Sequence, residues 1–262
     1  AGADVLLMPP DPEVAINAVV AAVHAGRLTQ KRIERSVMRV LSAKAKLGLA
    51  TKRLVDLDAV DGIINSPESN ARAQQIADRA VTLVKNKAEV VPLRDPSKTC
   101  FLILIEPQST VMGQAFAQEV HRRTTAPVAF VDSSMPDLEL DQAAQRTSAC
   151  EAVVVAAFAP VAAYRGDVAL GGGFPALLTK LIASNKPMAL VALGNPYLLR
   201  NFPDVSAYLT TYSTVPPSEI AAVKALFGEI PIDGKLPITI PGIAKYGDGI
   251  HLDATVKNVS VP

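Results

Sequence analysis

The stretch MALVALGNPYLL, residues 188–199, decides the fold of this chain. Its first six residues are continuously apolar, which is typical of a strand buried on both faces of a parallel sheet. Gly194, Asn195 and Pro196 then end the strand with turn-forming residues. Because open α/β sheets bind ligands at the carboxyl ends of their strands, Asn195 and Tyr197 are candidate site residues. A purely structural turn, in which Asn195 bonds to the local backbone, explains the same residues equally well.

Similar apolar runs lie on both sides of this stretch and alternate with helical patterns. Further strands are predicted over 100–105, 127–131, 152–158, 206–212 and, as a last candidate, 235–240. Helices are predicted between them over 110–123, 138–149, 174–184 and 217–227. Repeated alternation with short connections predicts a doubly wound, mainly parallel α/β sandwich.

The chain begins with a strand-like apolar run, Val5 to Met8, that two prolines end. Asp11 and Thr29 are predicted to cap two helices that follow. Residues 50–65 are interpreted as a linker, and a third helix is predicted from Ser66 with Ile76, Ala80, Leu83 and Val84 on one side. A strand buried on both faces needs neighbours, and none precedes it. We therefore expect the chain to be the back portion of a longer protein.

Composition argues against several classes of partner. The net charge of +1 gives no electrostatic reason to bind nucleic acid or an anionic membrane. No apolar stretch approaches the ~20 residues of a membrane-spanning helix. The basic face of the second helix is interpreted as a solvated surface; it comprises Lys31, Arg32, Arg35 and Lys46. Cys100 and Cys150 are interpreted as two buried free thiols.

Known cofactor and nucleophile motifs are missing from the sequence. The predicted strand 100–105 leads into EPQSTVMGQAF, which lacks the glycine spacing of a dinucleotide site. Gly171, Gly172 and Gly173 are interpreted as a flexible turn before a helix. No histidine lies at metal-ligand spacing from another histidine or cysteine, and no serine lies in a nucleophile elbow. We therefore predict no cofactor and no metal. The acids near strand ends and loops are interpreted as caps or turns; they are Asp4, Asp11, Asp132 and Asp167.

Five segments, in order, resemble the family 3 glycoside hydrolases, in particular their two-domain β-N-acetylglucosaminidase branch. They are AGADVLLMP (1–9), GRLTQKRIERSVMRVLSAKAKLGL (26–49), ADRAVTLVKNKAEVVPL (77–93), ALGNPYLLRNFPDV (192–205) and GKLPITIP (234–241). The resemblance implies that residues 1–49 are the last strand and helices of a (β/α)8 catalytic barrel. Residues 50–93 would then be a linker and connecting helix, and residues 94–262 an α/β sandwich domain with a C-terminal tail.

The resemblance also implies a reaction, the retaining hydrolysis of β-linked sugars through an aspartate nucleophile. In the N-acetylglucosaminidase branch a His–Asp pair on a barrel loop is the acid/base, and both motifs lie upstream of the region matched here. No catalytic residue is therefore assigned. Other branches use an acidic residue from a second-domain loop, but APVAAYRGDVALGGG (159–173) contains no Glu, which favours the N-acetylglucosaminidase branch.

Substrate-binding candidates follow from this resemblance. Met8, at the end of the implied barrel strand, lies best for the sugar site, and the other candidates are Tyr164, Arg165, Asn195 and Tyr197. The implied partners are the barrel portion of the same protein and a carbohydrate. Two alternatives stay open, an independent small-ligand-binding module and a structural assembly domain. A bacterial cytoplasmic and an exported location both fit the sequence.

Overall fold

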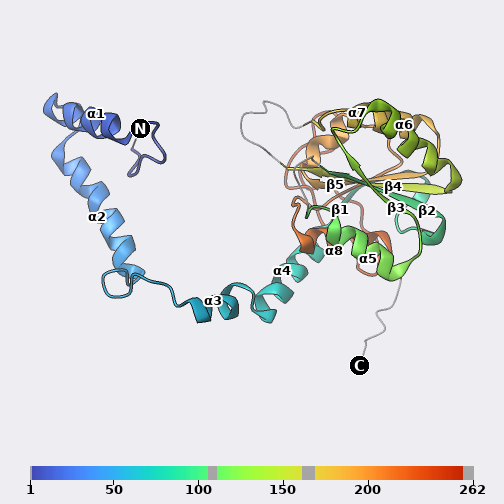
Figure 1. Cartoon of the computed structure of the whole chain (residues 1–262), viewed down its shortest axis with the longest axis horizontal. Coiled ribbons are helices and arrows are strands. Elements are labelled where there is room, and N and C mark those ends of the chain that lie inside the picture. The colour runs from blue at the N-terminus through green and yellow to red at the C-terminus, as the bar shows by residue number, and fades with distance from the viewer. Residues whose placement is uncertain (1, 106–110, 161–168, 256–262) are drawn as a thin grey trace. The chain divides into compact units, whose positions relative to one another are not determined.

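A computed structural model describes residues 2–105, 111–160 and 169–255 of the chain. It divides into two compact units, Ala1–Ser66 and Pro67–Pro262, which we call the N-terminal and C-terminal units (Figure 1).

The N-terminal unit consists of three helices, α1 (Pro12–His24), α2 (Gln30–Lys46) and α3 (Leu57–Ile64). Both predicted caps are present. The Asp11 side chain accepts the backbone N–H groups of Glu13 and Val14, and the Thr29 hydroxyl accepts that of Arg32. Helix α3 lies inside the segment 50–65 that is interpreted as a linker, where the sequence predicted no helix. Its apolar pattern is only two turns long, which is too short to separate from a loop by periodicity.

Val5 to Met8 do not form the strand that their apolar run predicted. All four side chains are between 60% and 87% exposed. A strand needs hydrogen-bonding neighbours on its flanks, and the described residues of the N-terminal unit contain no strand that could pair with this segment.

The C-terminal unit contains a six-stranded sheet in the order β1-β6-β5-β4-β2-β3. The strands are β1 (Thr82–Asn86), β2 (Thr99–Ile105), β3 (Val128–Asp132), β4 (Ala152–Ala159), β5 (Met188–Gly194) and β6 (Ala207–Thr210). Strands β2 to β6 are parallel, as predicted, and β1 pairs antiparallel with β6. The winding direction reverses between β2 and β4, which is the point where doubly wound sheets place ligands.

Helices cover both faces of the sheet (Figure 1). One layer contains α4 (Pro67–Ala80), α5 (Gln114–Arg123) and α8 (Pro216–Leu226), and the other contains α6 (Asp137–Arg146) and α7 (Phe174–Ala183). The described residues of this unit also contain four short 3-10 helices, η1 (Lys87–Glu89), η2 (Pro96–Lys98), η3 (Thr147–Ala149) and η4 (Pro196–Arg200).

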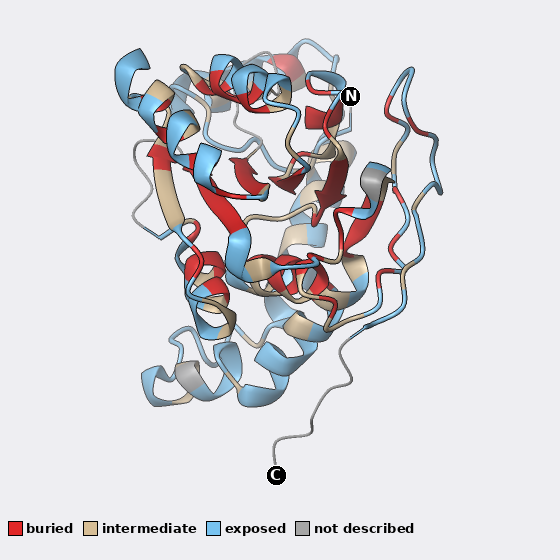
Figure 2. Cartoon of the chain, turned by 90° about the vertical axis from the view of Figure 1, so that its right-hand side faces the viewer, coloured by how far each residue is buried: buried red, intermediate tan, exposed pale blue. Residues whose placement is uncertain are grey.

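The central strands are apolar on both faces because each face packs against a helical layer, and they are buried along their length (Figure 2). Val154 belongs to the core beneath one layer and Val155 to the core beneath the other. Burial of each such side chain contributes about 2 kcal/mol. Since a slip of one residue would exchange the two faces, the pairing of Val155 with Leu190 is strongly specified.

Two element predictions in the C-terminal unit were wrong. Helix α4 ends at Ala80, and Leu83 and Val84 belong to β1, because the open edge of β6 accepts an extended strand there. Residues 235–240 form no strand. Pro237 has no N–H to donate, and the segment is held instead by single contacts such as the Leu236 N–H to the carbonyl of Asp248.

The interpretation of the cysteines as free thiols was also wrong, because Cys100 and Cys150 form a disulfide. Each residue sits at the beginning of a strand or just before one, and β2 and β4 are neighbours in the sheet. The two cysteines are 50 residues apart in the sequence, and only the pairing of β2 with β4 brings them close together.

Candidate functional site

The turn after β5 carries the first candidate residues, at the carboxyl edge of the parallel strands. The Asn195 N–H donates to the carbonyl of Ala159 at 3.1 Å, which ties the ends of β5 and β4 together. Asn195 is buried, and its side-chain oxygen accepts the backbone N–H of Tyr197 at 2.9 Å. Gly194 has a φ of 109°, and a Cβ there would lie 2.5 Å from the Ala159 carbonyl oxygen. Only glycine fits this close approach.

Buried side chains of β6 and η4 hold the same turn in place. The hydroxyl of Tyr208 on β6 donates to the Pro196 carbonyl at 2.8 Å. Burial raises the pKa of Tyr208, so the hydroxyl remains a donor. Leu198 and Leu199 are fully buried, while Tyr197 is half-buried. The turn is therefore rigid, and the structural interpretation of Asn195 has direct support in its backbone bond.

A strained tyrosine lies beyond the neighbouring strand. Tyr212 has a φ of 61°, a left-handed value that is unusual for a bulky side chain and that ends β6 two residues earlier than predicted. Its hydroxyl is 2.8 Å from the Thr82 hydroxyl on β1. The nearby Thr210 hydroxyl is fully buried and has no hydrogen-bond partner among the residues that the structure describes. Sequence reasoning missed this group because no sequence signal marks a left-handed tyrosine.

The first helix after β2 presents an amide-rich N-terminus, where doubly wound folds bind phosphate. Here a carboxylate from the chain itself lies at that position. Glu219 on α8 is 1% exposed and accepts the backbone N–H of Phe116 at 2.8 Å. Burial raises its pKa, while hydrogen bonds from the backbone N–H groups of Phe116, Gly113 and Ala115 oppose that rise. The N-terminus of α5, where an anionic ligand would bind, is thus occupied by the chain's own Glu219 carboxylate.

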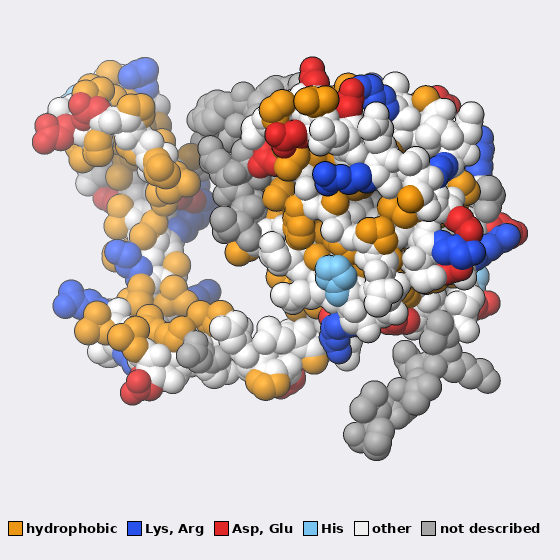
Figure 3. All heavy atoms as spheres, turned by 45° about the vertical axis from the view of Figure 1, so that its right-hand side comes forward, with side chains coloured by type: hydrophobic (Ala, Val, Ile, Leu, Met, Phe, Trp, Pro, Cys, Tyr) orange, Lys and Arg blue, Asp and Glu red, His pale blue; other side chains and the backbone are white. Residues whose placement is uncertain are grey.

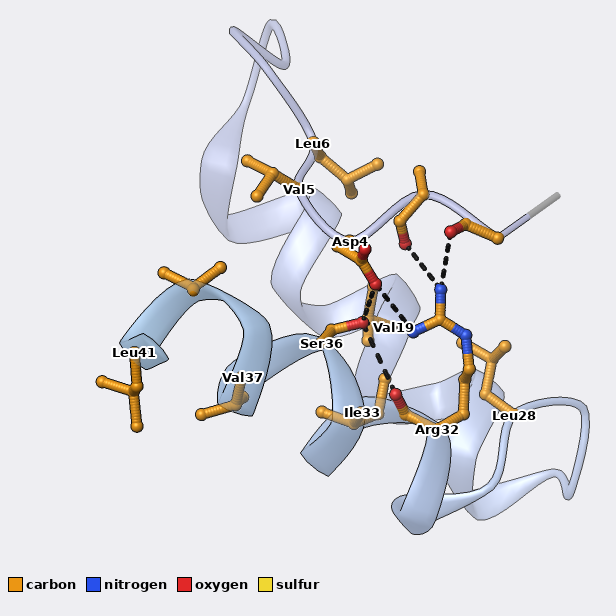
Figure 4. A pocket seen from close by; sticks show the side chains of 13 residues that line it. Asp4, Val5, Leu6, Val19, Leu28, Arg32, Ile33, Ser36, Val37 and Leu41 are labelled. Atoms are coloured by element: carbon orange, nitrogen blue, oxygen red, sulfur yellow. Dashed lines mark hydrogen bonds and ion pairs between the residues drawn. The ribbon is translucent and has the colours of Figure 1, made fainter. Parts of the chain in front are cut away.

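The N-terminal unit holds a charged cluster around Asp4 (Figure 4). Arg32 lies 3.1 Å from one carboxylate oxygen of Asp4, and Arg39 lies 2.7 Å from the other. The Ser36 hydroxyl donates to the same carboxylate at 2.8 Å, and Arg32 also donates to the carbonyl of Gly2 at 2.7 Å. Hydrogen bonds from Arg39 and Ser36 lower the pKa of Asp4 to about 2. The cluster fastens the first residues of the chain to α2, so the interpretation of Arg32 as merely solvated was wrong.

Beside this cluster lies an apolar groove of about 510 Å³ (Figure 4). Its apolar lining comes from the first residues, α1 and α2, and includes Val5, Leu6, Val19, Ile33, Val37 and Leu41. Exposed apolar side chains continue along the helices of this unit (Figure 3). An apolar surface of this extent marks an interaction face.

The family model of the glycosyl hydrolase family 3 C-terminal domain matches residues 81–258, which include the whole sheet. The chain belongs to glycoside hydrolase family 3. A curated relative in this family, the β-N-acetylglucosaminidase/β-glucosidase of Cellulomonas fimi, is 24% identical over 91% of the chain and 44% of the relative. The chain thus spans less than half of that relative's length.

Solved structures of family 3 enzymes share the fold. A β-N-acetylglucosaminidase from Paenibacillus superposes with a TM-score of 0.67 at 21% identity, covering 87% of this chain and 43% of that one. A β-glucoside phosphorylase superposes with a TM-score of 0.70 at 23% identity, covering 91% of this chain and 44% of that one. The sheet and its two helical layers are therefore those of the family 3 C-terminal domain.

The candidate residues of this family 3 chain fall in three places. Asn195 and Tyr197 lie together on the turn after β5. Met8 lies in the N-terminal unit and is 87% exposed, with a φ of 50°. Tyr164 and Arg165, like Asp167, lie outside the described residues.

Two further features of the described residues bear on partners. They contain no group of three His, Cys, Asp or Glu side chains arranged to hold a metal ion. None of their helices combines the length and the apolar character needed to cross a bilayer.

Proposed function

We propose that this chain is the C-terminal portion of a retaining family 3 glycosidase that releases β-linked N-acetylglucosamine-type sugars. The match of residues 81–258 to the family's C-terminal domain carries the proposal. The protein's residues for bond cleavage would lie upstream, in the barrel that the family resemblance implies.

Residues 1–49 would be the end of that barrel, with Val5 to Met8 as its last strand. Two observations support this assignment. The four residues are exposed and apolar, and the Asp4 cluster holds the segment against α2. A preceding barrel portion would supply the missing strand neighbour and would cover the apolar groove.

The C-terminal unit would support the barrel and form one side of the substrate cleft. The rigid turn of Asn195 and Tyr197 suits this role because it holds an aromatic ring with a polar tip at a fixed place. Met8 would lie near the sugar on the barrel side, and Tyr164 and Arg165, which follow β4 in the sequence, are the further substrate-binding candidates.

Amino-sugar specificity rests on the sequence of that loop. Residues 159–173 contain no Glu, and their only acid is Asp167, so the branch with its acid/base on the barrel is favoured. Relatives carry both N-acetylglucosaminidase and β-glucosidase names, and the structural neighbours include a β-glucoside phosphorylase. The complete protein should be assayed with an aryl β-N-acetylglucosaminide and an aryl β-glucoside, each with and without phosphate. A higher kcat/KM for the amino sugar is expected, and a preference for glucoside or a requirement for phosphate would overturn the assignment.

The chain alone should be inactive toward the aryl β-N-acetylglucosaminide, because the nucleophile and the acid/base supply most of the rate. Supplying the preceding barrel portion should restore turnover if the two pieces associate. Turnover by a pure sample of the 262-residue chain, at the level of an intact family member, would contradict the proposal that the catalytic residues lie upstream.

A second candidate function is an independent small-ligand-binding module, which the doubly wound sheet favours. The position of Glu219 argues against an anionic ligand at α5, since a phosphate would have to displace a buried carboxylate. Calorimetry of the chain with a nucleotide and with N-acetylglucosamine separates the two functions. Micromolar binding of either compound without the barrel supports the module.

A further inference from the structure

The Cys100–Cys150 disulfide lies at the amino edge of the sheet, opposite the carboxyl edge that carries Asn195 and Tyr197. Cys100 is the second residue of β2, and Cys150 follows η3 and precedes β4. Their Cα atoms are 5.7 Å apart. Strand pairing sets this distance, because Thr99 pairs with Ala152 and the Glu151 N–H donates to the carbonyl of Lys98 at 2.8 Å.

The surroundings of the bond are fixed and shielded. Cys100 and Cys150 are 6% and 8% exposed. The ammonium of Lys186, two residues before β5, donates to the carbonyls of Thr147, Ser148 and Cys150. Three donated hydrogen bonds hold the segment that carries Cys150, so both sulfur atoms keep their positions at one end of the β2–β4 pair.

We propose that this bond is a permanent structural disulfide, and that the protein matures in an oxidising compartment outside a reducing cytosol. One cysteine thiolate attacks an exogenous disulfide, forming a mixed disulfide and releasing one thiolate. The second cysteine thiolate then displaces the other exogenous sulfur. The two cysteines lose two protons and two electrons, and the exogenous disulfide gains them as two thiols.

Three observations favour a permanent bond over a transient one. Burial keeps reductants from the sulfur atoms, whereas labile and catalytic disulfides are exposed. The bond closes a segment of 50 residues that contains α5, β3 and α6, so it restricts the unfolded chain strongly. Disulfides of this kind persist in the periplasm and outside cells and are rare in a reducing cytosol.

The position of the bond predicts an effect on stability without an effect on the candidate site. Five residues of β2 separate Cys100 from the carboxyl end of the strand, or roughly 17 Å of extended chain. The turn of Asn195 and Tyr197 lies at that opposite edge, after β5.

The redox state can be measured on the protein in its own cells. Cells are quenched with acid, the protein is unfolded, and free thiols are alkylated with a heavy maleimide before and after reduction. We expect the peptides that carry Cys100 and Cys150 to be unlabelled before reduction and labelled after it, as read by mass spectrometry. Labels on the Cys100 and Cys150 peptides before reduction would show free thiols in vivo and would overturn the proposal.

A second experiment measures the Tm of the full chain with and without reductant. The same measurement is made on a Cys100→Ala/Cys150→Ala variant. Reductant should lower the Tm of the C-terminal unit by about 10 °C. The double variant should have the same lowered Tm and should not respond to reductant. An unchanged wild-type Tm after verified reduction overturns the structural role, even if the double variant fails to fold.

Discussion

The carboxylate of Glu219 on α8 accepts a hydrogen bond at 2.8 Å from the backbone N–H of Phe116 in the first turn of α5. The two residues are 103 positions apart in the sequence and both are buried. The contact satisfies an N–H group that α5 itself leaves without a partner, and a negative charge is favourable at a helix N-terminus. One buried acid therefore joins two helices of the same layer.

Replacing Glu219 by Ala should destabilise the C-terminal unit by roughly 3 kcal/mol, because the buried N–H loses its acceptor and a cavity remains. Glu219→Gln should cost less, since the amide oxygen still accepts. Chemical denaturation of the full chain measures both changes. Glu139→Gln, an exposed acid in the first turn of α6, is the matched control and should change stability little. Equal losses of stability in Glu219→Gln and Glu139→Gln would contradict the proposal that Glu219 joins α8 to α5.

The same acid predicts a dependence of stability on pH. Burial raises the pKa of Glu219, so between its ordinary and its raised pKa the folded state binds more protons than the unfolded state. Its contribution to stability is therefore fully present below the ordinary pKa and decreases as the pH rises through the raised one. Denaturation at a series of pH values should show this decrease in wild type and a flatter profile in Glu219→Gln. Parallel profiles would mean that Glu219 does not titrate as proposed.

Asn195→Ala and Tyr197→Ala, made in the complete enzyme, should lower kcat/KM more than they lower the Tm. A local turn alone predicts the reverse for Asn195, a loss of about 1 kcal/mol with unchanged kinetics. Tyr208→Phe is a useful control, because it removes the hydroxyl that donates to Pro196 and leaves both candidate side chains in place. Unchanged kcat/KM in both alanine variants would contradict the proposal that Asn195 and Tyr197 line the substrate cleft.

Amides at positions 4–8 should exchange with solvent much faster than those at 188–193. The first segment has exposed side chains and forms no strand, whereas β5 is paired on both sides and buried. Hydrogen exchange on a proven monomer of the chain tests this directly. In the complete protein the segment should become protected, because the barrel would supply its neighbours. Equal protection of the two segments in the monomer refutes the barrel-strand assignment.

Arg39→Gln should raise the pKa of Asp4, which Arg39, Ser36 and Arg32 lower to about 2. Because the folded pKa lies below the usual value of about 4, the cluster stabilises above that value and weakens as the pH falls toward 2. Carboxyl NMR titration of both proteins measures the shift. Lys31→Gln, on the same helix without an ion pair to Asp4, should leave the pKa near its wild-type value. An unchanged pKa of Asp4 in Arg39→Gln would show that Arg39 does not stabilise the Asp4 carboxylate.

The sequence by itself determined the parallel sheet and the family. Apolar runs such as 152–158 and 188–193 are readable because a strand covered on both faces must be apolar at every position. The helix starts at Asp11 and Thr29 were equally readable, since capping is a local interaction between a side chain and nearby amides.

Only the tertiary structure decided the features that join distant segments. Thr82 to Asn86 continue an apolar pattern that fits a helix until the open edge of β6 pairs with them. Cys100 and Cys150 could be recognised as a pair only after β2 and β4 became neighbours. The same holds for Glu219 and Phe116, and for Asp4 and Arg39. Periodicity and capping act over a few residues, whereas pairing, ion pairs and disulfides depend on distances in space that local pattern does not encode.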